Sequence, residues 1–195
     1  MLRQTITAAR LLAALTLLTG VVYPLVVTGI ARLVAPAAAA GSLVDRTGRP
    51  APPAAAVGSA LIGQDFRGDR YLWGRPSATA PRPYQGDASG GSNLGPLHPD
   101  ITAAAEARLA TLAAGGAAIA AVPVDLVTAS ASGLDPHISP AAAAVQIARI
   151  ARARGIPEDR VREVVRRHTV GRTLGILGEP RVNVLLVNLA LDAGE

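Results

Sequence analysis

The chain has 195 residues, enough for one domain plus a membrane segment. It contains no cysteine, and all 19 basic residues are arginine, which excludes disulfides, thiolate metal sites and the lysine of a P-loop or a Schiff base. The formal net charge is +5, but from Pro36 onward only 16 arginines (19 less Arg3, Arg10 and Arg32) stand against 14 acids. Because no nucleic-acid-binding motif accompanies them, we expect no nucleic-acid partner, and we interpret the basic strip from Arg149 to Arg167 as a solvated helical face.

An uncharged stretch of 21 residues runs from Leu11 to Ala31, between Arg10 and Arg32. As a helix it would be about 31 Å long, which matches a hydrocarbon core of about 30 Å. The pattern therefore predicts a single membrane span followed by a linker and one folded domain. The predicted parts are a cytoplasmic tail at 1–10, a transmembrane helix at 11–32, a linker at 33–57 and a small extracytoplasmic α+β domain at 58–195.

A cleaved signal peptide is the alternative to a retained anchor, because Pro36–Gly41 contains an Ala-x-Ala cleavage pattern. The apolar stretch is longer than the roughly 7–15 residues of a signal core, and Arg32 separates it from that pattern. We favour the anchor, which predicts a single-pass protein of the cell membrane (inner or plasma membrane) with its N-terminus in the cytoplasm. Cleavage would instead give a secreted binding protein.

Helix end signals predict three helices after the linker. Ser139 is the expected N-cap of the second helix and Gly155 its stop. In the third helix, Val161, Val164 and Val165 share the inward face. The predicted ranges are Pro99–Ala114, Pro140–Arg154 and Pro157–His168.

Two further segments, Ser59–Phe66 and Val182–Leu191, are predicted as strands. The second is apolar on both faces, which is typical of a buried central strand. Helices around a small sheet place the domain in the α+β class.

Four aromatic residues outside the anchor, Phe66, Tyr71, Trp73 and Tyr84, fall within 19 positions. They form either one corner of the core or a docking surface, where tyrosine and tryptophan are favoured. Arg75 lies beside them and has three possible roles: pairing with a carboxylate of a partner, stacking on Trp73, or closing an ion pair inside the domain.

Two long loops, Tyr84–Pro99 and Val122–Pro140, are rich in glycine, serine and other turn residues. In the first, the small residues let backbone N–H groups converge on a phosphate, and Asn93 could hydrogen-bond a base or a ribose. The alternative is a structural or docking loop. The nucleotide-binding candidates are Ser89, Gly90, Gly91, Ser92 and Asn93.

The second loop holds Asp135, His137 and Ser139, the three groups of a nucleophilic triad. A local triad is disfavoured because the Asp-Pro-His stretch cannot easily aim all three side chains at one another, and Ser139 is better used as a helix cap. We therefore predict no catalytic residue in this chain. The three histidines lack metal-ligand spacing, so we predict no metal site.

Five segments together resemble one known family, the C subunit of the bacterial Kdp complex, a high-affinity potassium-transporting P-type ATPase. The likeness covers nearly the whole chain, in the order of that family, although His98 stands where asparagine is expected. The segments are Ala60–Phe66, Gly74–Ala78, Tyr84–Pro99, Val122–Pro140 and Pro180–Asp192.

The resemblance implies an accessory subunit that joins a channel-like, potassium-binding subunit to a P-type pump subunit. It implies ATP and potassium as requirements of the complex, with no cofactor held by this chain alone. It also implies a contribution to ATP affinity, for which Ser89–Asn93 is the natural candidate, but a domain outside the cell would never meet cytosolic ATP. The docking candidates are Tyr71, Trp73, Arg75, Tyr84, Asp135 and His137. The alternatives from other classes are a membrane-anchored hydrolase that uses Asp135, His137 and Ser139, and a secreted binding protein.

Overall fold

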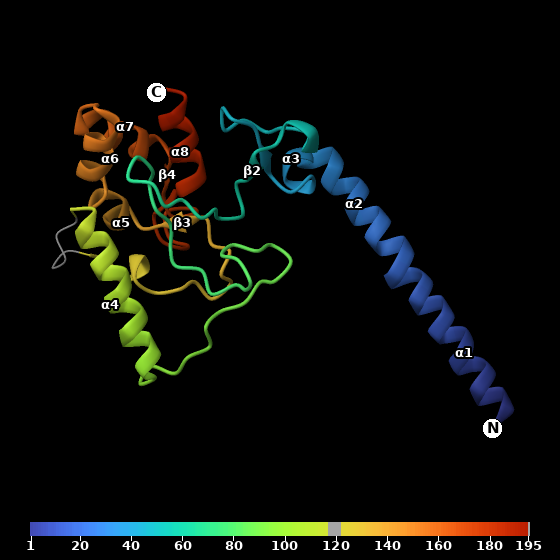
Figure 1. Ribbon diagram of the computed structural model, residues 1–195. Helices are drawn as coiled ribbons and strands as arrows, with labels where there is room; N and C mark the ends of the chain where they lie inside the picture. The colour runs from blue at the N-terminus through green and yellow to red at the C-terminus, as the bar shows by residue number, and fades with distance from the viewer. Residues whose placement is uncertain (117–121, 195) are drawn as a thin grey trace. The chain divides into compact units, whose positions relative to one another are not determined.

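The computed structural model describes residues 1–116 and 122–194 and divides the chain into two compact units, Met1–Leu43 and Val44–Glu195. Figure 1 traces both units from the N-terminus to the C-terminus.

The first unit is dominated by one continuous apolar helix, made of α1 (Leu2–Leu17), a π-helical turn (Leu18–Val22) and α2 (Tyr23–Val34). This helix of 33 residues is long and apolar enough to cross a membrane. Pro24 cannot donate a backbone hydrogen bond, and the π turn that ends two residues before it is the kind of irregularity expected where a proline interrupts the hydrogen-bond ladder of a helix. The helix begins at Leu2, so it extends beyond the span predicted at 11–32. The short α3 (Pro36–Ala39) follows.

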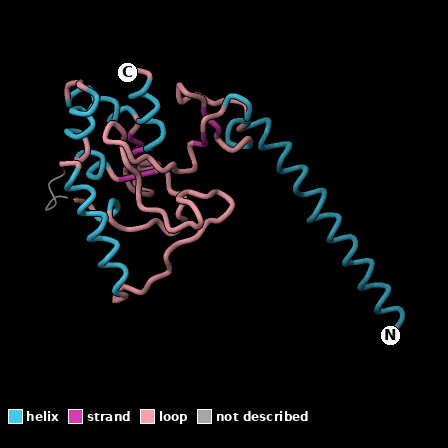
Figure 2. Tube along the Cα trace, in the orientation of Figure 1, coloured by secondary structure: helices cyan, strands magenta, loops and turns pink. Residues whose placement is uncertain are grey.

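The second unit contains two small sheets. The first pairs β1 (Leu43–Val44), at the junction of the units, with β2 (Gly58–Ser59). The second is antiparallel, with β5 (Arg181–Asn183) between β3 (His137–Ile138) and β4 (Thr169–Val170). Ile138 and Thr169 both lie opposite Val182, which is fully buried. Figure 2 shows how short these strands are beside the loops that connect them.

The helices of the second unit follow the predicted end signals closely. α4 spans Pro99–Ala114, as predicted. The Ser139 hydroxyl accepts the N–H of Ala142, and Gly155 ends the helical region with a left-handed φ of 67°. The segment between them is two helices rather than one, α5 (Pro140–Ala144) and α6 (Ile147–Arg154). The third is α7 (Glu158–Arg167), which packs against α6 and α8, and its three inward valines are buried as predicted.

Both strand predictions were wrong over most of their length. Only Ser59 of the segment Ser59–Phe66 belongs to a strand. The segment Val182–Leu191 leaves the sheet after Asn183 and becomes α8 (Val184–Asp192). The Asn183 side chain accepts the N–H of Leu186 and caps this helix. A short apolar run that is buried on all sides fits a strand or a core helix equally well. Here the capping bond of Asn183 favours the helix.

Two buried amides position the segment that carries the aromatic residues. The Asn188 side chain, on α8, accepts the N–H of Leu72 at 2.8 Å and donates to its carbonyl at 2.9 Å. The Gln146 side chain does the same for Trp73, at 2.9 and 3.1 Å. The segment belongs to no sheet, and the two side-chain amides supply the hydrogen bonds that a neighbouring strand would otherwise make. The backbone polar groups of Leu72 and Trp73 are therefore satisfied inside the core.

Candidate functional site

The two glycine- and serine-rich loops lie directly against each other. The N–H of Gly90 donates to the carbonyl of Ser132 at 2.9 Å, and the Ser89 hydroxyl donates to the same carbonyl at 3.1 Å. A Cβ atom on Gly91 would stand 2.8 Å from the carbonyl oxygen of Ala131, closer than side chains tolerate. Gly91 therefore permits a close backbone contact between the loops.

This contact bears on the predicted phosphate cradle. Because the N–H of Gly90 is already bonded to the neighbouring loop, Ser89–Asn93 has one donor fewer for an anion. Ser92 and Asn93 are exposed, and Asn93 adopts a left-handed φ of 53°, a conformation that asparagine tolerates well.

A turn from Ser77 to Tyr84 ties the first loop to the second. The Ser77 hydroxyl donates to the carbonyl of Gly133 at 2.6 Å and accepts the N–H of Tyr84 at 2.9 Å. The Tyr84 hydroxyl donates to the carbonyl of Arg75. The ring of Tyr84 occupies the space that a side chain at Gly63 would need, and its hydroxyl does the same at Gly74. Burial raises the pKa of Tyr84 to about 12. Tyr84 is thus a half-buried residue whose side chain packs against the neighbouring backbone.

Arg75 forms an ion pair inside the domain, one of the three roles considered for it. Its guanidinium lies 3.4 Å from the carboxylate of Asp135 and donates to the carbonyl of Ala129 at 3.3 Å. Asp135 also accepts the N–H of His137 at 2.9 Å. Burial acts to raise the pKa of Asp135, but the hydrogen bonds from His137 and the charge of Arg75 outweigh it, and the pKa lies below its ordinary value. All three side chains remain partly exposed.

Ser139 is engaged away from His137. Its hydroxyl donates to Asp125 at 3.2 Å while capping α5, and its N–H donates to the same carboxylate at 2.7 Å. Asp135 and His137 are neighbours, but among the described residues no hydrogen bond joins His137 to Ser139. The three groups therefore do not form a Ser-His-Asp relay in this arrangement.

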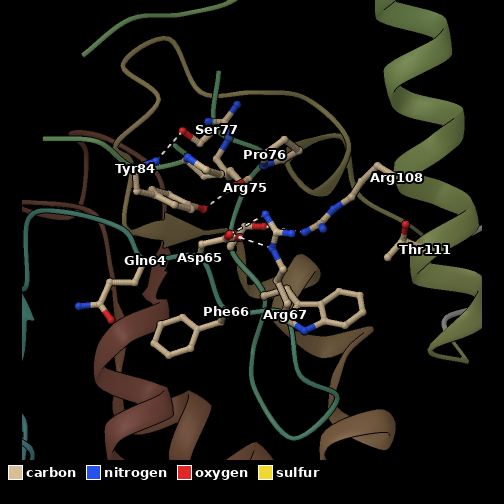
Figure 3. Close-up of a pocket in the computed structure, with 13 residues that line it drawn as sticks. Gln64, Asp65, Phe66, Arg67, Arg75, Pro76, Ser77, Tyr84, Arg108 and Thr111 are labelled. Carbon is tan, nitrogen blue, oxygen red and sulfur yellow. Dashed lines mark hydrogen bonds and ion pairs between the residues drawn. The ribbon is translucent and has the colours of Figure 1, made fainter. Parts of the chain in front are cut away.

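A cavity of about 370 Å³ opens next to these loops (Figure 3). On its lining, the Arg67 guanidinium pairs with the Asp65 carboxylate at 2.7 Å, and Arg108 reaches toward them from α4. The Arg108 guanidinium donates to the carbonyls of Leu126 and Gly74 at 3.1 and 3.0 Å, and burial lowers its pKa. Arginine stays protonated, so Arg108 and Arg67 contribute positive charge and hydrogen-bond donors to the lining, and the carboxylate of Asp65 neutralises part of that charge.

The aromatic residues divide between the core and its edge. Trp73 is buried, with the Arg149 guanidinium 3.9 Å above its ring. The Tyr71 ring packs at a tilt against Phe66, with the ring centroids 5.3 Å apart, and its hydroxyl donates to the Asp192 carboxylate at 3.2 Å. Of the predicted docking candidates, Trp73 thus lies inside the core, whereas the others keep part of their surface exposed.

Sequence reasoning missed the residues that hold these pieces together: Arg108, Asp125, Gln146 and Asn188. Each contacts a segment distant in sequence, and no local pattern marks such a residue. Among the described residues there is no group of three histidine, aspartate or glutamate side chains that could hold a metal ion.

Comparison with known proteins gives a consistent result. A family model described as K+-transporting ATPase, c chain, matches residues 5–193. The chain is 61% identical over 180 residues to the potassium-transporting ATPase KdpC subunit of Polaromonas naphthalenivorans, covering 92% of this chain and 89% of that protein. It is 59% identical to the protein of the same name from Ralstonia nicotianae (91% and 84% covered) and 60% identical to that from Sorangium cellulosum (93% of each).

Proposed function

The chain belongs to the family of K+-transporting ATPase c chains, and we propose that it is the non-catalytic accessory subunit of a high-affinity, ATP-driven potassium uptake complex. In this proposal it stabilises the assembly of a potassium-binding, channel-like subunit with a P-type pump subunit. The observation that carries it is the family match over residues 5–193. ATP and potassium are substrates of the complex, and this chain alone holds neither.

The described site supports a binding role rather than chemistry. The Ser139 hydroxyl is held by Asp125, and the cavity is lined by paired or backbone-bonded arginines. Deleting the chain should disassemble the other subunits and abolish potassium-dependent ATPase activity, while the purified full chain should show no ATPase activity. An assembled, fully active complex without this chain would refute the proposal.

We place the folded unit outside the cell, with the helix Leu2–Val34 as a single membrane crossing and the N-terminus in the cytoplasm. Arg3 and Arg10 near the start of the helix support this orientation. A reporter fused after Glu195 should be active only if it is of the extracytoplasmic type. Activity of a cytoplasmic reporter at that position would reverse the assignment.

A contribution of Ser89–Asn93 to ATP affinity conflicts with this orientation. The KM of the complex for ATP distinguishes between the two possibilities. If the loop faces outward, Ser92→Ala and Asn93→Gly should leave the KM of the complex for ATP unchanged. A raised KM in either variant, with normal assembly, would instead assign the loop a nucleotide contact and refute the outward placement.

A further inference from the structure

An apolar hairpin, residues 171–179, connects β4 to β5. Thr173 and Leu177 face each other across it and exchange two backbone hydrogen bonds, at 2.8 and 2.9 Å. At its base Arg172 pairs with Glu179 at 2.6 Å. The segment is thus an ordered hairpin with its own ladder and its own ion pair.

The tip of this hairpin presents apolar side chains to solvent. Leu174 is 86% exposed, Ile176 74% and Leu177 58%. These are three of the eight exposed large apolar side chains in the described residues from Val44 onward, and a fourth, Val170, directly precedes the hairpin. Apolar residues scattered singly over a surface need no explanation, but such a concentration on one protrusion marks an interaction site.

The turn at the tip makes leucine an unexpected choice. Leu174 and Gly175 both have left-handed φ angles, 55° and 77°, and the N–H of Ile176 donates to the carbonyl of Thr173. This is the pattern of a tight hairpin turn that favours asparagine followed by glycine. Leucine in that conformation is uncommon and costs backbone energy. Local folding therefore disfavours Leu174, which points to a role for its side chain in an external contact.

The base of the apolar hairpin leads into a second cavity, of about 580 Å³. Glu179, Pro180 and Arg181 line one part of it, and Val124 and His137 line another. Val124 is itself exposed. The base of the apolar hairpin and the partly exposed His137 therefore border the same cavity.

We infer that the apolar hairpin inserts into an apolar pocket on another protein subunit of the same transport complex, with the cavity beside Val124 forming the rim of the contact. This inference rests on the proposed assembly role. The hairpin contains no aromatic residue, and its single arginine is paired with Glu179, whereas segments that settle at a membrane surface use aromatic side chains and unpaired basic ones. A protein pocket therefore fits the hairpin better than lipid does.

The variant Leu174→Asn separates folding from docking, because asparagine suits the left-handed turn and lacks the apolar side chain. In the full chain co-expressed with the other subunits, we expect an unchanged or raised thermal midpoint and about a ten- to hundredfold loss of affinity for the complex. Leu61→Asn is the matched control, because Leu61 is 58% exposed and lies in a turn remote from the hairpin in sequence. Equal co-purification of Leu174→Asn and the parent chain would overturn the inference.

A photo-crosslinking residue at position 176 of the full chain identifies the occupant. A covalent adduct with another subunit of the co-expressed complex, identified by mass spectrometry and absent when the crosslinker replaces Leu61, supports the inference. An adduct only with lipid, or only with a second copy of this chain, overturns it.

Deletion of the whole chain distinguishes this inference from the proposed function. If the complex assembles without the chain, the assembly role itself fails. If assembly needs the chain but tolerates Leu174→Asn and gives no subunit adduct at position 176, only the hairpin inference fails.

Discussion

Asn188→Ala tests whether the buried amides hold the aromatic segment in place. Asn188 is 1% exposed and bonds both the N–H and the carbonyl of Leu72, which is fully buried. The substitution leaves one donor and one acceptor unpaired in the core, and each such group costs about 1–3 kcal/mol. We therefore expect the free energy of unfolding to fall by about 2–6 kcal/mol, a large part of the stability of an ordinary domain.

Trp73 is the only tryptophan of the chain, is buried, and directly follows Leu72, so its fluorescence reports on this region during urea unfolding of the full chain in detergent. A loss of 2 kcal/mol lowers the urea midpoint by about 1 M at a typical slope. Asn93→Gly is the control, because it removes an exposed amide at a left-handed position where glycine is unstrained. A midpoint for Asn188→Ala within the range of this control would show that the amide bonds do not hold the segment.

Three further outcomes follow from the loops. The pKa of Tyr84 is raised to about 12, so between about pH 10 and pH 12 the folded state keeps a proton that the unfolded state releases. The free energy of unfolding should therefore fall over this range, and it should fall by more in the parent than in Tyr84→Phe. The pKa of Asp135 is lowered from its ordinary value of 3.8, so its charged form stabilises the fold above that pH, and this stability is lost as the pH falls through the folded pKa. In Asp135→Asn the free energy of unfolding should therefore depend less on pH below about pH 4, and a curve parallel to that of the parent would contradict the lowered pKa. Gly91→Ala should lower the free energy of unfolding by about 1–3 kcal/mol, because the new Cβ atom meets the Ala131 carbonyl. Gly90→Ala, whose Cβ atom has no contact closer than 4.0 Å, should lower it less, and equal urea midpoints for the two variants would refute the close packing of the loops.

The helices could be predicted because their end signals are local. Ser139 and Gly155 need only their own neighbours to cap and stop a helix, and both do so. The segment Val182–Leu191 could not be assigned in this way, because its apolar pattern fits either class and the capping role of Asn183 depends on where the sheet ends. The break between α5 and α6 was missed because the alanines and valine around it do not mark an end.

The bonds that organise the candidate site join residues far apart in sequence. Asn188 contacts Leu72 across 116 positions, and Gln146 contacts Trp73 across 73. Nothing in the neighbourhood of a single asparagine or glutamine indicates which distant backbone it will satisfy. The sequence left three roles open for Arg75, and only the fold shows that it pairs with Asp135 inside the domain.

The contrast between the glycine-rich loops and the apolar hairpin shows which kind of group leaves a surface open to a partner. In the loops, backbone and hydroxyl groups find partners within the domain: Gly90 and Ser89 meet Ser132, and Ser77 meets Gly133. Gly91 and Gly133 are explained by close internal contact, because a Cβ atom would stand 2.8 Å from the carbonyl oxygen of Ala131 at Gly91 and 2.7 Å from that of Gly90 at Gly133. At the hairpin, the backbone is equally well bonded, but the side chains of Leu174 and Ile176 have no comparable burial. Exposure of apolar surface to water is unfavourable, so a partner that covers the hairpin would gain more binding free energy than one that covers the loops.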